Sequence, residues 1–163
     1  PVMARSVVAA EDANFCRHWG FDMAAIRTAL AEGSGRGAST ITQQVAKNVF
    51  LWQGRSWVRK ALEAFITPIV EILWTKRRIL EVYLNVAEFG EGVFGVQAAA
   101  RFHFNRDALD LDPRHAALLA AVLPAPQSRD AGDPTERIRR RATAILDGAA
   151  TIAGDDRATC FQG

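Results

Sequence analysis

The chain has 163 residues, of which 49% are apolar and 23% are charged, the composition of an ordinary globular domain. This composition excludes a disordered segment, a collagen-like repeat and a disulfide-rich miniprotein. The formal net charge of +2 is too small for a dedicated nucleic-acid-binding protein, so no nucleic-acid partner is expected. Cys16 and Cys160 are the two cysteines, too few for a disulfide framework or a four-cysteine metal site, and they indicate little about redox compartment.

The sequence offers no membrane-spanning segment. A bilayer span takes about 18–20 uncharged apolar residues, whereas the longest apolar run, Ala116–Pro126, has 11 residues and two prolines. The chain begins at Pro1 without a charged leader or an apolar signal core. We therefore expect residues 1–163 to form a single domain excised from a longer protein, with any N-terminal membrane anchor outside this chain.

Apolar residues recur at three- and four-residue spacing, which predicts a chain that is almost entirely helical. Asp22 is expected to cap a short helix, and the glycine-rich segment Glu32–Gly37 to form a loop that is disordered without substrate. Thr40 and Gln43 have the spacing of a capping box, so another helix is predicted to start near Thr40. The predicted apolar stripe of that helix consists of Ile41, Val45, Val49 and Trp52.

Proline and glycine divide the rest of the chain. A long helix is predicted from about Ser56 towards Trp74, kinked or split by Pro68, and another from about Lys76 to Glu88. Asp112–Pro113 predicts an N-cap followed by proline at the first position of a very apolar helix. Asp133–Pro134 repeats this pattern and predicts the start of a final helix.

The first polar cluster with potential chemistry begins at Glu11. Glu11 and Asp12 are followed by several aromatic residues, including Phe15 and His18. A carboxylate among aromatic side chains tends to lose solvation, which raises its pKa and suits it for proton transfer. The alternative is a pair of solvent-facing acids near a helix end.

The second cluster lies on one flank of the helix predicted from Thr40. Within about 100° of arc this flank carries a hydroxyl, two amides and an ammonium, from Thr40, Gln43, Gln44 and Lys47. Amides bind sugar hydroxyls, and an ammonium binds an anion. The flank therefore suits a sugar–phosphate ligand, the alternative being a solvated polar face.

The third cluster spaces Arg55, Arg59 and Glu63 four residues apart on one helical side. Two guanidiniums and a carboxylate can hold a diphosphate and a developing charge close together. The alternative is a surface ion pair, which contributes only about 0.3–0.5 kcal/mol. The basic run Arg137–Arg141 is interpreted as a solvated helix face.

The chain resembles the peptidoglycan glycosyltransferase family, which comprises the transglycosylase domains of class A penicillin-binding proteins and the monofunctional biosynthetic peptidoglycan transglycosylases. Five ordered motifs carry the resemblance: EDxxFxxHxGFD (Glu11–Asp22), GxSTITQQxxKN (Gly37–Asn48), RKxxE (Arg59–Glu63), ILExYLN (Ile79–Asn85) and GxxxAA from Gly95. No SxxK motif of a penicillin-binding domain follows, so the monofunctional enzymes are the closer match. Asn105 stands where the family usually has glycine, and asparagine tolerates the left-handed conformation better than most residues.

The resemblance implies a mainly α, lysozyme-like glycosyltransferase fold with two helical lobes around a cleft. It implies polymerisation of lipid II into glycan strands, with inversion at the anomeric carbon and release of undecaprenyl diphosphate. The implied location is the bacterial cytoplasmic (inner) membrane, with the catalytic domain on its periplasmic or extracellular side. The implied partners are lipid II, the nascent glycan strand, that membrane and other cell-wall synthesis proteins.

The same resemblance assigns roles to individual residues. Glu11 matches the base that takes the proton from the 4-hydroxyl of the acceptor sugar, and we predict that it is buried with a raised pKa. Glu63 matches a second glutamate that helps to stabilise the diphosphate side. No cofactor is implied as obligatory, and a divalent cation, Mg²⁺ or Mn²⁺, is an optional partner of Glu63. The basic donor-site positions are Lys47, Arg55 and Arg59, and the residues that line and shape the cleft are Asp12, Phe15, His18, Thr40, Gln43, Gln44 and Asn48.

Two other function classes fit parts of the sequence. A lysozyme-like hydrolase or lytic transglycosylase would also use paired acids in a helical cleft, but it would not need the amide-rich and basic side. A non-enzymatic helical module that binds anionic membranes or a partner would explain Arg137–Arg141. That module would leave Glu11 and the Thr40–Gln44 face without a role.

Overall fold

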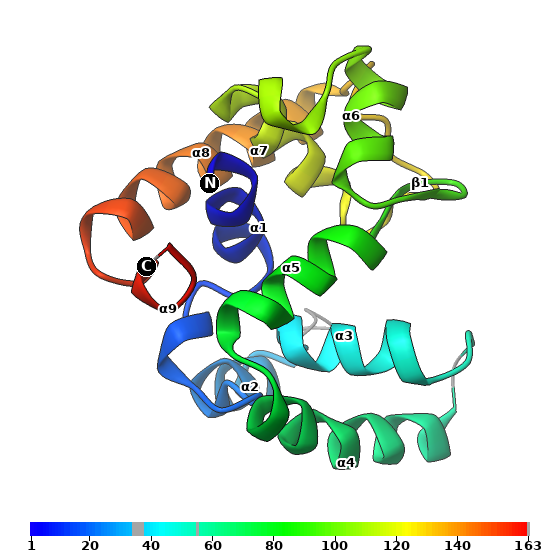
Figure 1. Ribbon diagram of the computed structural model, residues 1–163, viewed down its shortest axis with the longest axis vertical. Coiled ribbons are helices and arrows are strands. Elements are labelled where there is room, and N and C mark those ends of the chain that lie inside the picture. The colour runs from blue at the N-terminus through cyan, green and yellow to red at the C-terminus, as the bar shows by residue number, and fades with distance from the viewer. Residues whose placement is uncertain (34–37, 55, 163) are drawn as a thin grey trace.

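The computed structural model describes residues 1–33, 38–54 and 56–162 as packed helices with one small β-hairpin (Figure 1). This architecture confirms the mainly α fold that the apolar periodicity predicts. The elements in chain order are α1 (Val2–Glu11), the 3₁₀ helix η1 (Phe15–Arg17), α2 (Met23–Ala31), α3 (Ile41–Phe50), α4 (Trp57–Leu73), α5 (Lys76–Val86), β1 (Glu88–Gly90), β2 (Val93–Phe94), α6 (Val96–Phe104), η2 (Ala108–Asp110), α7 (Pro113–Val122), α8 (Glu136–Gly154) and α9 (Thr159–Gln162).

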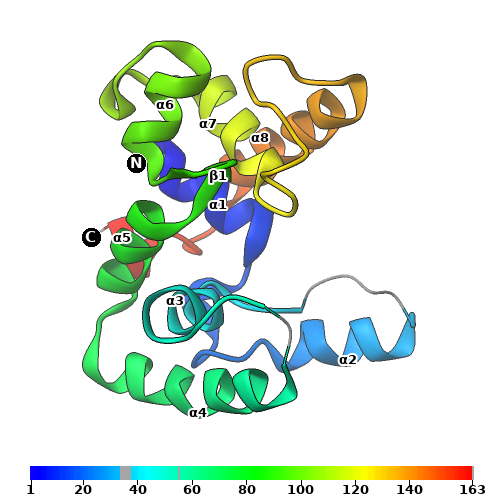
Figure 2. The same ribbon diagram turned by 90° about the vertical axis from the view of Figure 1, so that its right-hand side faces the viewer.

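The helices form two lobes, which Figure 2 shows one above the other. One lobe contains α2, α3 and α4, and the other contains α1, α6, α7 and α8, with α1 packed against both α7 and α8. Helix α5 joins the lobes, because it packs against α3 while Ile79, Leu80 and Tyr83 are buried in the core. A cavity of about 520 Å³ lies between α3, α5, the hairpin and the segment after α7. Two helical lobes around a cleft are therefore confirmed.

Side-chain caps fix where several helices begin, as predicted. Asp22 accepts a hydrogen bond from the backbone N–H of Ala25, and Asp112 from that of His115. Thr40 and Gln43 form the predicted capping box at the start of α3. The Asp133–Pro134 prediction is wrong by two residues: Thr135 caps α8, which begins at Glu136. The hydroxyl of Thr135 accepts a bond from the third helical residue, which Asp133 is too early to reach.

The structure also tests the predictions made for individual positions in α3, in α4 and after α6. The apolar stripe of α3 is half right, because Ile41 and Val45 are buried whereas Val49 and Trp52 are exposed. Pro68 lies inside an unbroken α4 and does not split it. Asn105 adopts the left-handed conformation, as predicted, with φ 51° and ψ 43°. Of the loop predicted to be disordered, Glu32–Gly37, the structure describes Glu32 and Gly33 directly after α2, and residues 34–37 lie outside its described part.

The β-hairpin was not predicted from the sequence. Helix α5 ends at Val86 rather than Glu88, and Glu88 begins a strand that pairs antiparallel with β2. The segment Glu88–Phe94 lacks the Asn-Gly or Asp-Gly signal of a two-residue hairpin. Its turn uses Gly92 at φ 71°, a conformation that glycine adopts without strain.

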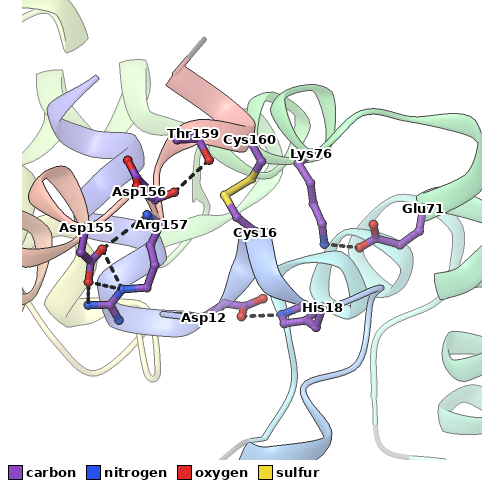
Figure 3. The surroundings of a disulfide bond; sticks show 10 residues. All are labelled: Asp12, Cys16, His18, Glu71, Lys76, Asp155, Asp156, Arg157, Thr159 and Cys160. Atoms are coloured by element: carbon purple, nitrogen blue, oxygen red, sulfur yellow. Dashed lines mark hydrogen bonds and ion pairs between the residues drawn. A yellow bond between two sulfur atoms is a disulfide. The ribbon is translucent and has the colours of Figure 1, made fainter.

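A disulfide bond joins the two ends of the fold, as Figure 3 shows. Cys16 in η1 is bonded to Cys160 in α9, across 144 residues of sequence. Beside this bond Phe15 packs against Phe161, with ring centroids 6.4 Å apart, and Lys76 lies over the Phe15 ring at 4.4 Å. The C-terminal segment is thus attached to the segment that follows Glu11, a link that two cysteines alone could not reveal in the sequence. None of the described helices has the length and apolar character required to cross a bilayer.

Candidate active site

Glu11 is the last residue of α1, and its side chain is 14% exposed. The side-chain amide of Gln44 in α3 donates a hydrogen bond to Glu11 Oε2 at 3.0 Å. Gln44 in turn accepts a hydrogen bond from the Tyr83 hydroxyl at 3.3 Å, so α5 supports this arrangement. Burial raises the pKa of the Glu11 carboxyl, and the Gln44 hydrogen bond and the Arg141 charge oppose that shift without cancelling it. The prediction of a buried Glu11 with a raised pKa is confirmed.

Asp12 and His18 connect the segment after Glu11 to the start of α3. Asp12 Oδ1 lies 2.7 Å from His18 Nε2, as Figure 3 shows, and Asp12 Oδ2 accepts a hydrogen bond from the Ile41 N–H at 3.0 Å. Phe15 is fully buried beside them. These predicted site residues shape the site by fixing α1 relative to α3, and Asp12 also lines a small cavity together with Glu11 and Thr40.

The polar flank predicted on α3 divides into two parts. Thr40 and Gln43 are buried in the capping box, and the Thr40 hydroxyl also donates to the Gly20 carbonyl at 2.6 Å. Gln44, Lys47 and Asn48 instead line the cavity between the lobes. The capping pair therefore shapes the site, and the remaining three residues are placed to contact a ligand.

Glu63 gathers positive charge on α4. Its side chain is only 4% exposed, with Oε2 3.4 Å from Arg59 Nη1 and Oε1 2.5 Å from Lys60 Nζ. The Arg59–Glu63 pair predicted as the bland alternative exists, but it is buried rather than at the surface, and Arg59 Nε has no protein partner among the described residues. Arg55, the other predicted guanidinium, lies outside the described residues.

Lys47 is coupled electrostatically to both acids. Burial lowers the pKa of its ammonium, Glu63 and Glu11 oppose that effect, and the charges of Arg59 and Lys60 add to it. A half-buried ammonium that feels both carboxylates lies within electrostatic reach of each. Helix α3 links the two acids, because its Gln44 bonds to Glu11 while the helix packs against α4, the helix that carries Glu63. Lys47 lies one turn after Gln44 on α3.

Three residues of this site were not selected from the sequence. Lys60 follows Arg59 in the RKxxE motif, and its spacing of three from Glu63 could have indicated the contact. Tyr83 appears in the sequence only as the tyrosine of the ILExYLN motif, and its hydroxyl partner Gln44 is 39 residues away. Arg141 was interpreted as part of a solvated face, but its Nη2 lies 3.7 Å from Glu11 Oε1. No local pattern shows that α8 crosses α1 at this point.

The residues around Glu63 do not fit a resident divalent cation. Both carboxylate oxygens already accept from the cations Arg59 and Lys60, and the charge of Lys47 acts on the same carboxylate. Mg²⁺ is bound by oxygen ligands, and here it would meet three positive side chains instead. Among the described residues, a possible ligand group for a metal ion consists of Asp12, His18 and Asp22. Its carboxylates are already engaged: Asp12 accepts a hydrogen bond from the Ile41 N–H, and Asp22 accepts from Asn14 and Ala25.

Comparison with known proteins agrees with this geometry. Residues 1–150 match the family described as transglycosylase. A biosynthetic peptidoglycan transglycosylase of Jannaschia sp. (strain CCS1) is 67% identical over 161 residues, which cover 99% of this chain and 67% of the relative. Proteins of the same description from Pseudomonas aeruginosa and Stutzerimonas stutzeri are each 57% identical, over 93% and 86% of this chain. The chain spans 67% and 60% of the lengths of these two relatives.

Proposed function

The chain belongs to the transglycosylase family, and from this we propose that it is a peptidoglycan glycosyltransferase that polymerises lipid II into glycan strands. The observation that carries the proposal is the arrangement around Lys47. One ammonium is coupled both to a buried acid with a raised pKa and to an acid that gathers cations. A glycosyl transfer from a diphosphate carrier needs these two parts close together, a base for the acceptor and positive charge for the leaving group.

In the proposed reaction Glu11 acts as general base. Its carboxylate takes the proton of the acceptor 4-hydroxyl while that oxygen forms a bond to the anomeric carbon of the growing chain. The bond from the anomeric carbon to the diphosphate oxygen breaks, and undecaprenyl diphosphate leaves with the electron pair. Attack from the face opposite the leaving group inverts the anomeric configuration. Burial makes Glu11 a stronger base than an exposed glutamate, because its protonated form is favoured.

The leaving diphosphate is assigned to the cationic group formed by Lys47, Arg59 and Lys60. Glu63 holds Arg59 and Lys60 in place before substrate arrives. A phosphate oxygen can then accept a hydrogen bond from Arg59 Nε, which has no partner among the residues that the structure describes. Asn48 lines the adjoining cavity, where it can bind a sugar hydroxyl. Arg55 keeps its predicted role as a further basic donor-site residue.

The test of this function is a choice between two substrates. Incubated with labelled lipid II, the chain should produce polymer that migrates slowly on a gel, and incubated with purified sacculi it should release no fragments. A lysozyme-like hydrolase gives the opposite result. Polymer formation should also continue in EDTA at a rate within about twofold of that with Mg²⁺, because the protein's own cations occupy the place of a metal at Glu63. Complete loss of activity in EDTA would contradict the metal-free proposal.

The proposed location is the periplasmic or extracellular face of the bacterial cytoplasmic membrane. Disulfides such as Cys16–Cys160 persist in oxidising compartments and are rare in the cytosol, which supports an envelope location. The outer face of α4 supports membrane contact, since it exposes large apolar side chains over its whole length. These side chains are Trp57, Val58, Leu62, Phe65, Ile69, Ile72 and Leu73. Such contact would bring the site to the membrane, where an acceptor and a donor that both carry lipid chains are held. Other cell-wall synthesis proteins remain proposed partners.

We expect vesicle binding to depend on this α4 face. The double variant Phe65→Gln, Ile72→Gln should bind vesicles of phosphatidylglycerol and phosphatidylethanolamine at least tenfold more weakly in co-sedimentation, since each apolar side chain contributes roughly 1.5–3 kcal/mol on full burial. Leu109→Gln is the matched control: Leu109 is 96% exposed but lies in η2, on the other lobe. Equal loss of binding in both variants would refute the proposed surface.

A further inference from the structure

Helix α8 brings Arg141 to the proposed base. Helices α1 and α8 pack against each other, and Arg141 Nη2 lies 3.7 Å from Glu11 Oε1. The other oxygen, Oε2, accepts the hydrogen bond from Gln44 of α3. The two oxygens of one carboxylate are therefore held separately, one by a charge from α8 and the other by an amide from α3.

Arg141 differs from the two arginines before it. Arg139 and Arg140 both pair with Glu136 one turn earlier on α8, and Arg140 is 80% exposed. Arg141 is 38% exposed, its Nε is buried without a partner among the described residues, and its recorded ion pair reaches a different helix. Its neighbours therefore form the solvated face that the sequence predicted, whereas Arg141 points into the site.

We propose that Arg141 is a positioning residue whose charge, beside Oε1, keeps the Glu11 carboxylate ionised. The inference rests on the proposed role of Glu11 as general base. Arg141 itself touches no reacting atom in this account, because its contact is with the carboxylate.

The charges that face Glu11 show why such a residue is needed. Burial and the neighbouring charge of Asp12 both favour the neutral carboxyl, which cannot accept a proton. Gln44, Arg141 and Lys47 favour the ionised form, and Arg129, in the segment after α7, also feels the Glu11 charge. The Tyr83 hydroxyl, behind Gln44, is neutral, since burial and Glu11 raise its pKa well above the ordinary value.

Substrate binding would leave Arg141 as the principal positive charge acting on Glu11, beside the Gln44 hydrogen bond. When a diphosphate occupies the cationic group, its negative charge offsets that of Lys47, so less of that ammonium's effect reaches Glu11. Arg141 approaches from α8, on the lobe opposite α4, and keeps its full effect. Arg141 and the Gln44 hydrogen bond would therefore together keep the base ionised until the transfer step.

The test compares the pH–rate profiles of Arg141→Gln and Arg140→Gln on lipid II. Arg141 lowers the pKa of Glu11, so its removal raises that pKa further and moves the acid limb of kcat to higher pH. We expect Arg141→Gln to lose about tenfold in kcat on the acid limb, because an opposite charge within about 4 Å favours the ionised carboxylate, and to recover to within about threefold at alkaline pH. KM for lipid II should change less than twofold, and Arg140→Gln should follow the parent curve.

Three further outcomes separate this inference from its premise. Arg141→Lys keeps the positive charge, so its acid limb should lie close to that of the parent enzyme. This variant also tests the proposal if Arg141→Gln does not fold. The positioning role would be overturned if the acid limb of Arg141→Gln stayed at the pH of the parent. It would also be overturned if a folded Arg141→Lys showed a higher KM with no pH dependence. If Glu11→Gln remained active, the base assignment itself would fail, whereas an inactive Glu11→Gln with an unshifted Arg141→Gln limb refutes only Arg141.

Discussion

Replacing Glu11 with glutamine should abolish glycan polymerisation while leaving the fold intact. A positioned general base contributes roughly 10²–10⁴-fold to rate, so the residual activity of Glu11→Gln should be at least 100-fold below the parent. The substitution keeps the shape of the side chain, and a glutamine oxygen can still accept the bond from Gln44. The measurement is lipid II turnover alongside thermal unfolding, with a melting temperature expected within a few degrees of the parent.

The activity of the parent enzyme should depend on pH as expected for a carboxyl group with a raised pKa. A general base works only when it is deprotonated, and burial raises the pKa of Glu11. The rate should therefore fall as pH decreases through a midpoint higher than that of an exposed glutamate, and Glu11→Gln should show no such limb. Glu91→Gln is the matched control, because Glu91 is exposed in the hairpin turn. Near-normal polymerisation by Glu11→Gln would remove the base from the mechanism.

Local patterns were sufficient to predict most helices. Caps such as Asp22 and Asp112, and the capping box at Thr40, depend on residues three positions apart, so they can be read from the sequence. The hairpin at Glu88–Phe94 escaped because its strands have three and two residues, too short for an alternating pattern. The α8 start was misplaced by two residues because Asp133 and Thr135 are both good caps.

The site was predictable where its contacts are local. Glu63 lies one helical turn from Arg59, so spacing alone placed this pair together. The contacts of Glu11 are different, because Gln44 is 33 residues away and Arg141 comes from a distant helix. The helical arc that starts at Thr40 selected Gln44, but nothing in the basic run Arg137–Arg141 distinguished Arg141 from its solvated neighbours. Arg141 contacts Glu11 because of the angle at which α8 packs on α1, and a short stretch of sequence does not reveal such a packing angle.

Replacing Lys47 with methionine should impair catalysis without the pH signature of the base. Lys47 interacts electrostatically with both acids, lines the cavity and belongs to the group assigned to the leaving diphosphate. Removing one such stabilising group from a preorganised site typically costs about 10²–10³-fold in kcat. Methionine retains most of the aliphatic length, so packing is largely preserved. We expect kcat/KM on lipid II to fall by that factor.

The loss should be similar at every pH between the limbs, because charge stabilisation of a diphosphate requires no proton transfer by Lys47. Arg78→Met provides the control, since Arg78 is an exposed cation whose ion pair is with Glu81, outside the site. Lys47→Met also removes a repulsion toward Arg59 and an attraction toward Glu63, effects of opposite sign that should leave unfolding little changed. If Lys47→Met kept kcat/KM within about threefold of the parent, the diphosphate would have to be held elsewhere. The charge of Lys47 affects the pKa of Glu11 much less than burial does, so the acid limb of Lys47→Met should stay close to that of the parent. If that limb shifted as far as the limb of Arg141→Gln, the base Glu11 and the cation Lys47 could not be assigned separate roles.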